Sequence, residues 1–187
     1  MSPELLEAVR ARALDPATRI DNFPLHGAGI SSPLTDTQLA ESIDLLGFRP
    51  PATLVDLYRA VGNGGFGPEY GLMGLVGGAD DDLGRNAVEL YLNDTKTYPN
   101  HPDWNWPRHL LHIADLGCAM NACIDCSDEE GRLVLFEPNV LDDRMMTRNG
   151  LFPMPVTFSE WMQGWVDGDP FLPILEAAMA APRLYPQ

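Results

Sequence analysis

The stretch PPATLVDLYRAVGNGGFGP, residues 50–68, constrains the fold of this chain more than any other. It predicts an amphipathic helix, because prolines suit a helix start and apolar side chains recur with a period of 3.6 residues. Those side chains are Leu54, Leu57, Tyr58 and Val61. Gly62 or Asn63 then supplies the left-handed residue that ends a helix, and further glycines allow a tight reversal into the apolar run Tyr70–Val76. The sequence therefore predicts a helix–turn–strand unit.

The glycine-rich turn raises the question of phosphate binding. Phosphate loops place their glycines after a strand and before a helix, so that N–H groups of the helix N-terminus face the anion. Here the helix comes first, and the turn would present carbonyl groups at the negative end of the helix dipole. The order of elements favours a structural turn over a nucleotide site.

Further helices are predicted before and after this unit. Residues Ser2–Leu14 form an amphipathic segment, and residues 15–33 are an irregular connecting arm with several prolines and glycines. The capping boxes Thr35–Gln38 and Thr157–Glu160 each open a helix. These two helices end at Gly47 and Gly168, and a last short helix directs Leu172, Leu175 and Met179 inward.

A run of aspartates precedes another predicted helix, Leu83–Lys96. The run consists of Asp80, Asp81 and Asp82. Carboxylates at a helix N-terminus stabilise it by roughly 0.3–1 kcal/mol each, which favours a capping role. Metal binding is the weaker alternative, because consecutive side chains point in different directions.

Three segments in the second half of the chain predict successive antiparallel strands: Leu110–Ala114, Cys118–Cys126 and Arg132–Glu137. The turn at 127–131 has a hairpin length and carries glycine where a positive φ is needed. Together with the earlier strand, these strands predict an α+β fold, a single domain whose central antiparallel sheet is flanked by helices. We expect residues 1–34 to form an N-terminal helix and arm, and residues 35–187 to form the α+β domain.

The cysteines Cys118, Cys123 and Cys126 have the spacing of the first three ligands of a plant-type iron–sulfur protein. On a strand, however, Cys123 would point away from the other two, and Cys118 would lie roughly 26 Å from Cys126. No fourth cysteine exists. Buried free thiols explain the pattern better than a cluster, and neither a metal nor a cofactor is predicted.

The histidines His109 and His112 stand three residues apart, and no further ligands at zinc-like spacing accompany them. Nucleophile elbows, Walker loops and metalloprotease helices are absent from the sequence. We therefore expect no catalytic residues. An enzyme or small-ligand binder that uses the glycine turn or the thiols is the weakest of the hypotheses for function.

The net charge of −15 restricts the possible partners. It favours basic partners and argues against nucleic acids and anionic membrane surfaces. The N-terminal residues do not resemble a signal peptide, and no window approaches the ~20 apolar residues of a membrane span. With an odd number of cysteines, the simplest expected location is the reducing cytoplasm.

Three stretches together resemble the SUKH superfamily of fungal cell-wall synthesis regulators and bacterial immunity proteins. They are LVDLYRAVGNGGFGP, LLHIADLGCAMNACIDCSDEEGRLVLFEPN and TFSEWMQGWVDG, and the resemblance covers residues 35–168. It implies an α+β domain without enzymatic activity. In bacteria, its usual role is to bind and neutralise a polymorphic toxin, often a nuclease.

The leading hypothesis is therefore a cytoplasmic immunity protein that binds a cognate, basic toxin. The alternative is an intracellular scaffold or regulatory adaptor of the cell-wall regulator type. Loop position and composition predict the partner-binding residues, which are Glu69, Tyr70, Asp80, Asp81, Asp82, Asp103 and Trp104. For Trp104, packing of the Tyr98–Pro107 loop onto the core is the favoured alternative to partner contact. The oligomeric state is left open.

Overall fold

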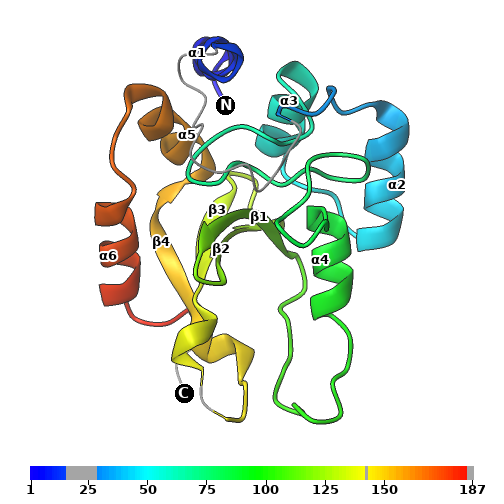
Figure 1. Ribbon diagram of the computed structural model, residues 1–187, viewed down its shortest axis with the longest axis vertical. Helices are drawn as coiled ribbons and strands as arrows, with labels where there is room; N and C mark the ends of the chain where they lie inside the picture. Colours follow the sequence, from blue (N-terminus) through cyan, green and yellow to red (C-terminus); the bar gives the residue numbers. More distant parts are fainter. Residues whose placement is uncertain (16–28, 142, 185–187) are drawn as a thin grey trace.

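The computed structural model describes residues 1–15, 29–141 and 143–184 (Figure 1). In chain order, its elements are α1 (Pro3–Leu14), α2 (Asp36–Leu46), α3 (Ala52–Ala60), α4 (Ala87–Asp94), β1 (Leu110–Gly117), β2 (Met120–Asp125), β3 (Arg132–Phe136), the 3-10 helices η3 (Pro138–Val140) and η4 (Thr147–Gly150), β4 (Leu151–Thr157), α5 (Phe158–Asp167) and α6 (Leu172–Ala180). The four strands form an antiparallel sheet flanked by helices, which confirms the predicted α+β fold.

The sheet is a meander in which each strand pairs with the next one along the chain, in the order β1-β2-β3-β4. All three strands predicted in the second half of the chain are present. Helix α4 packs beside β1, whereas α5 and α6 pack beside β4, so the helices cover opposite ends of the strand order (Figure 1). Residues Leu133 to Phe136 of β3 are all buried, because both faces of that strand are covered.

The early strand predicted over Tyr70–Val76 is wrong. This segment contributes only an isolated bridge from Leu72 to Ala114, and the fourth strand is β4 instead. The backbone of this segment pairs with nearby loop residues instead: Leu72 N–H donates to the Phe66 carbonyl oxygen at 2.7 Å, and Gly74 N–H donates to the Ala79 carbonyl oxygen at 2.7 Å. Strand β4 escaped prediction because it contains Pro153 and Pro155, and proline is tolerated on an edge strand such as this one.

The predicted capping boxes open α2 and α5. The Thr35 and Thr157 side chains accept from the backbone N–H groups of Gln38 and Glu160, and these two side chains reach back to the cap residues. Both helices end, as predicted, at a glycine in the left-handed conformation: Gly47 with φ 75° and Gly168 with φ 81°. These helix boundaries are encoded locally.

Helix α4 begins later than predicted. Its N-cap is Asn86, which forms a capping box with Glu89, so the aspartates at 80–82 lie in the preceding loop and do not cap this helix. The sequence contains the correct signal, an Asn followed three residues later by Glu. The predicted start of the helix was too early because the acidic run at 80–82 was interpreted as its N-terminal signal.

The unit around α3 contains the predicted helix and tight turn, but its helix does not end on a left-handed Gly62 or Asn63. The cap is Val61 in the right-handed region, and the positive φ values fall at Gly64, Gly65 and Gly67. Asn63 is fully buried, and its side chain bonds the backbone of the following loop. The turn is therefore held by a side chain as well as by glycines.

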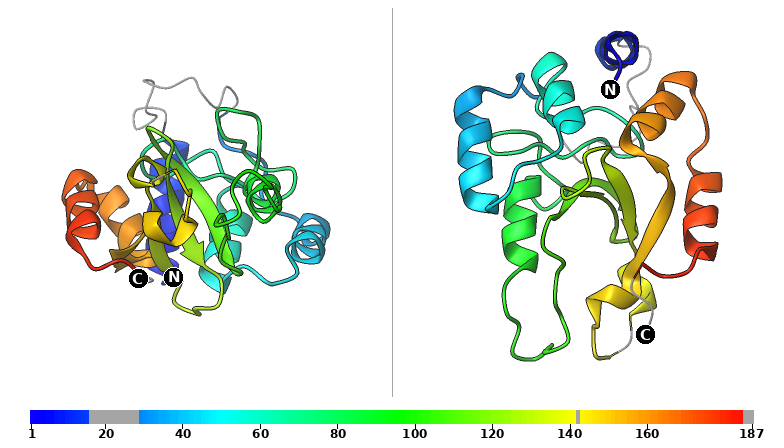
Figure 2. Two further views of the ribbon diagram at one scale, coloured as in Figure 1. Left: turned by 90° about the horizontal axis from the view of Figure 1, so that it is seen from below. Right: turned by 180° about the vertical axis from the view of Figure 1, so that it is seen from behind.

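Helix α1 packs against α5 and α3, and Leu5, Val9 and Ala13 belong to the same hydrophobic core as the sheet (Figure 2). The predicted irregular arm lies largely at residues 16–28, outside the described residues. Of the α6 residues predicted to point inward, Leu172 is 60% exposed and Met179 is 38% exposed, because the buried residue of this helix is Ala178. Among the described residues, no helix has the length and apolar character needed to cross a membrane.

Candidate functional site

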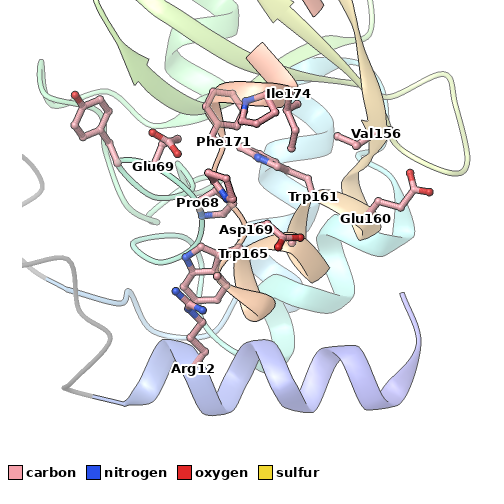
Figure 3. Close-up of a pocket in the computed structure, with 15 residues that line it drawn as sticks. Arg12, Pro68, Glu69, Val156, Glu160, Trp161, Trp165, Asp169, Phe171 and Ile174 are labelled. Carbon is pink, nitrogen blue, oxygen red and sulfur yellow. The ribbon is translucent and has the colours of Figure 1, made fainter. Parts of the chain in front are cut away.

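The main candidate site is a surface pocket of about 770 Å³ between α1, α5, the start of α6 and the loop at 66–71 (Figure 3). We call it the α5 pocket. Trp161 and Trp165 enter it from α5, and Phe171 enters from the start of α6. In Figure 3, α1 runs along one side and Arg12 points from it toward Trp165. Three parts of the chain that are distant in the sequence thus meet here: α1, the loop at 66–71, and the segment from α5 to the start of α6.

Glu69 and Tyr70 enter the pocket from a tight turn. The Gly71 N–H donates to the Pro68 carbonyl oxygen at 2.9 Å, and Leu72 N–H donates to the Phe66 carbonyl oxygen at 2.7 Å. Glu69 itself has a positive φ of 53°, a conformation that non-glycine residues adopt infrequently. This backbone geometry holds the Glu69 side chain at the pocket (Figure 3).

Aromatic rings make up much of the pocket wall. The ring centroids of Trp161 and Phe171 are 6.0 Å apart, within the range of favourable aromatic pairs. The Arg12 guanidinium lies 4.9 Å from the centroid of the Trp165 ring, and its Nη1 donates to the Val166 carbonyl oxygen at 2.8 Å. The face of Trp165 therefore already accommodates one guanidinium group.

Three carboxylates line the pocket: Glu69, Glu160 and Asp169. Burial raises the pKa of the half-buried Glu69 carboxyl above its ordinary value, because desolvation disfavours the charged form. Hydrogen bonds from the Thr157 backbone and side chain lower the pKa of Glu160. Among the described residues that line the pocket, Arg12 is the only one with a cationic side chain, so this lining carries an excess of negative charge.

The structure separates the seven predicted partner-binding residues. Glu69 and Tyr70 lie in the α5 pocket, while Asp80, Asp81 and Asp82 lie in the loop before α4. Asp103 lines a second pocket of about 580 Å³ beside Arg108 and Arg148, in the region between α4 and β1. In Figure 1, this α4–β1 segment lies at the end of the molecule opposite α1.

Asp81 is not the exposed residue that the sequence predicts. It is 6% exposed, its Oδ1 accepts from the N–H groups of Leu83 and Arg85, and its Oδ2 accepts from the Arg85 guanidinium at 2.6 Å and 2.9 Å. Asp80 and Asp82 are exposed. Asp81 therefore organises the loop that displays its neighbours.

Trp104 follows the packing alternative. Its indole N–H donates to the Asp94 carbonyl oxygen at 2.7 Å, and its ring stacks on Trp106 with centroids 6.3 Å apart. Tyr98 and Phe136 contact it edge-on. These contacts fix the 98–107 loop to the sheet and leave Trp104 half-buried.

One chemically suggestive cluster was missed by the sequence reasoning. Asp94 Oδ2 lies 3.0 Å from His112 Nε2, and His112 Nδ1 lies 3.6 Å from the Cys123 sulfur. The order carboxylate–imidazole–thiol is that of cysteine hydrolases. The signal was available, because His112 of β1 pairs with Cys123 of β2 across the hairpin.

The burial of this cluster is incompatible with nucleophilic catalysis. Cys123 is 0% exposed and His112 is 1% exposed, and the Trp106 ring covers the imidazole at a centroid distance of 4.2 Å. Burial also raises the pKa of the Cys123 thiol well above its ordinary value, which suppresses the nucleophilic thiolate. We assign the cluster a structural role in joining α4 to the sheet.

The three cysteines differ in their exposure. Cys118 is exposed in the β1–β2 turn, Cys123 is buried and Cys126 is half-buried, and all three thiols are free. The prediction of buried thiols therefore holds for Cys123 but is wrong for Cys118, because β2 starts only at Met120. In the part of the chain that the structure describes, no group of three or more His, Cys, Asp or Glu side chains is placed to hold a metal ion.

Fold and site together define a class, an α+β domain that presents an acidic, aromatic-lined pocket beside a meander sheet. The chain belongs to the SMI1 / KNR4 family (SUKH-1), whose model matches residues 33–164, more than half of the sequence. No curated protein and no solved structure matches the chain. Membership supports a protein-binding domain of the immunity or regulator type, in a family that is generally non-catalytic.

Proposed function

We propose that this chain is an immunity protein that acts in the cytoplasm, where it binds and neutralises a cognate toxin of basic charge. The observation that carries the proposal is the acidic exterior, with a net charge of −15, combined with membership of a family of immunity and regulator domains. Toxins that act on nucleic acids tend to be basic, and opposite charge accelerates encounter by about 10- to 1000-fold. Neutralisation then needs only tight binding and no chemical step.

The proposed contacts are the exposed or half-buried members of the predicted set. They are Glu69 and Tyr70 in the α5 pocket, Asp80 and Asp82 before α4, and Asp103 in the 98–107 loop. Asp81 and Trp104 support these surfaces through the hydrogen bonds described above. Because these residues lie in separate segments, a toxin that touches all of them needs an extended contact surface.

The experiment is neutralisation in cells. A toxin gene next to the gene for this chain is expressed from an inducible promoter, with and without the chain, and survival and complex formation are measured. Rescue of growth together with a stoichiometric complex supports immunity. If the chain binds no neighbouring toxin and its loss alters cell-wall synthesis instead, the regulator alternative replaces the proposal.

A further inference from the structure

We propose that the α5 pocket binds a segment of the toxin in which an arginine or lysine side chain lies next to an apolar side chain. This inference rests on the proposed function, and it specifies which surface recognises the toxin and by what chemistry. Three features of the pocket support it: the charges of its lining, its aromatic rings, and the parts of the chain that form it.

The charges of the pocket are complementary to a cation. Among the described residues that line the pocket, the carboxylates of Glu69, Glu160 and Asp169 outnumber the single guanidinium of Arg12, so the lining carries net negative charge. Burial raises the pKa of the Glu69 carboxyl, because its charged form is less well solvated at the pocket than in water. A bound cation relieves that penalty, because an opposite charge nearby favours the ionised carboxylate.

The aromatic and apolar side chains of the pocket are complementary to the charged end and to the methylene groups of a long basic side chain. Trp165 already holds the Arg12 guanidinium at 4.9 Å, so its geometry is suited to cation–π contact. Phe171 and Ile174 provide partly buried apolar surface next to the carboxylates. Arginine and lysine cover such surface with their methylene groups while their charged ends reach a carboxylate.

About half of the residues that line the pocket lie outside the part of the chain that matches the family. Arg12 lies before residue 33, and Trp165, Asp169 and Phe171 lie after residue 164. The α5 pocket is therefore built jointly by the family domain, which supplies Glu69, Glu160 and Trp161, and by segments that flank it. Such segments are suited to recognising one particular partner, since specificity requires contacts that the shared domain does not provide.

A second copy of this chain is a poorer occupant than a basic partner. Each copy carries a charge of −15, and two such surfaces repel one another. An anionic ligand would meet the same repulsion from the three pocket carboxylates. The charge of the pocket thus selects a cationic segment among the possible occupants.

The direct test uses a blocked hexapeptide that alternates leucine with arginine. Its control is the same peptide with citrulline in place of arginine, which keeps the shape and removes the charge. Binding is followed by the indole N–H signals in ¹H–¹⁵N NMR spectra, and Trp165→Phe assigns the signal of interest. We expect the arginine peptide to shift the Trp165 signal, and the citrulline peptide to bind about tenfold more weakly.

Variants distinguish the pocket from the general acidic surface. The double variant E69Q/D169N removes two pocket charges, and E41Q/D44N removes two exposed charges from α2, on the side of the molecule away from α5 and α6 (Figure 1). Only the pocket variant is expected to weaken arginine-peptide binding, by about five- to tenfold. Equal binding of both peptides, equal loss in both variants, or a concentration-dependent dimer abolished by Trp165→Phe would overturn the inference.

The same variants in the neutralisation assay separate this inference from the proposed function. If the natural chain fails to neutralise the neighbouring toxin, the proposed function fails, and the peptide experiment alone decides what the pocket binds. If the natural chain and E69Q/D169N neutralise and bind the toxin equally well, immunity stands and the pocket inference is wrong. The proposed function and the pocket inference are both supported when the natural chain neutralises the toxin, E69Q/D169N loses affinity for it and E41Q/D44N retains that affinity.

Discussion

At the scale of single residues, Asn63 determines the path of the chain after α3. Its Oδ1 accepts from Leu75 N–H at 2.8 Å, and its Nδ2 donates to the Val76 carbonyl oxygen at 3.1 Å. Neither Leu75 nor Val76 is in a strand, so the Asn63 amide replaces a sheet partner for these backbone groups. Buried backbone groups require such partners, because an unpaired group costs about 1–3 kcal/mol.

We therefore predict that Asn63→Ala lowers the free energy of unfolding by about 2–4 kcal/mol, since it leaves buried backbone groups unpaired. The measurement is urea denaturation followed by tryptophan fluorescence. The control is Asn121→Ala, which removes an exposed hydrogen bond to the Ala119 carbonyl oxygen and should cost about 0.5 kcal/mol or less. Equal losses in the two variants would show that the Asn63 amide is not a structural partner of this loop.

A second prediction at this scale concerns the reactivity of the three cysteine thiols. Cys118 is exposed, whereas burial raises the pKa values of the Cys123 and Cys126 thiols. Only a thiolate attacks a disulfide reagent, so one thiol per chain should react rapidly with Ellman's reagent in the native protein, and three after denaturation. Cys118→Ser should abolish the rapid phase. A rapid phase that survives in this variant would contradict the assigned burial.

At the scale of elements, the glycine turn after α3 leaves no room for a side chain at several positions. Gly64 has a φ of 84°, and a Cβ atom there would lie 2.6 Å from both the Gly74 nitrogen and the Leu72 carbonyl oxygen. Gly47 at the end of α2 has a similar φ of 75°, and a Cβ atom there would meet nothing within 4 Å. Alanine substitutions at Gly47 and Gly64 therefore distinguish the cost of a left-handed backbone conformation from the additional cost of steric overlap.

We predict that Gly47→Ala costs about 1–2 kcal/mol of stability, from the left-handed conformation alone. Gly64→Ala adds an overlap with backbone atoms, so its cost should exceed about 3 kcal/mol or prevent folding. Thermal unfolding of both variants provides the comparison, and the yield of folded protein serves where Gly64→Ala does not refold. Similar melting temperatures for the two would mean that the turn relaxes around the added methyl group.

Elements could be predicted from the sequence where their signals are local. The capping boxes at Thr35 and Thr157 and three of the four strands of the meander, β1, β2 and β3, were predicted because neighbouring residues encode them. Strand β4 was not, because its prolines are acceptable only on a sheet edge, and edge position is a property of the whole sheet. The start of α4 was misplaced where two local signals competed.

The candidate site was less predictable than the fold. Glu69 and Tyr70 were identified from loop position, but nothing near them in the sequence indicates that Arg12, Trp165 and Asp169 lie beside them. These residues meet because α1 packs on α5, which is a tertiary contact between the two ends of the chain. A pocket assembled in this way has no local sequence signature.

At the scale of the whole molecule, the charge of −15 and the α5 pocket are proposed to act at different stages of toxin binding. Long-range attraction acts before contact and sets the association rate, whereas desolvated contacts within an interface set the dissociation rate. Asp82 and Asp103 are exposed, and we propose that they act mainly on the association rate. The half-buried Glu69 is proposed to act on the dissociation rate.

The last prediction follows from this division. The double variant D82K/D103K should slow association with the toxin by about 2- to 10-fold at low salt, and the difference should shrink as salt screens the charges. Its dissociation rate should change little, while E69Q/D169N should mainly accelerate dissociation. Surface plasmon resonance at several salt concentrations measures both rates, and D82N/D103N, with half the charge change, should give an intermediate association rate. If D82K/D103K instead accelerates dissociation as strongly as E69Q/D169N does, the two aspartates lie inside the interface, and the toxin contacts both ends of the domain.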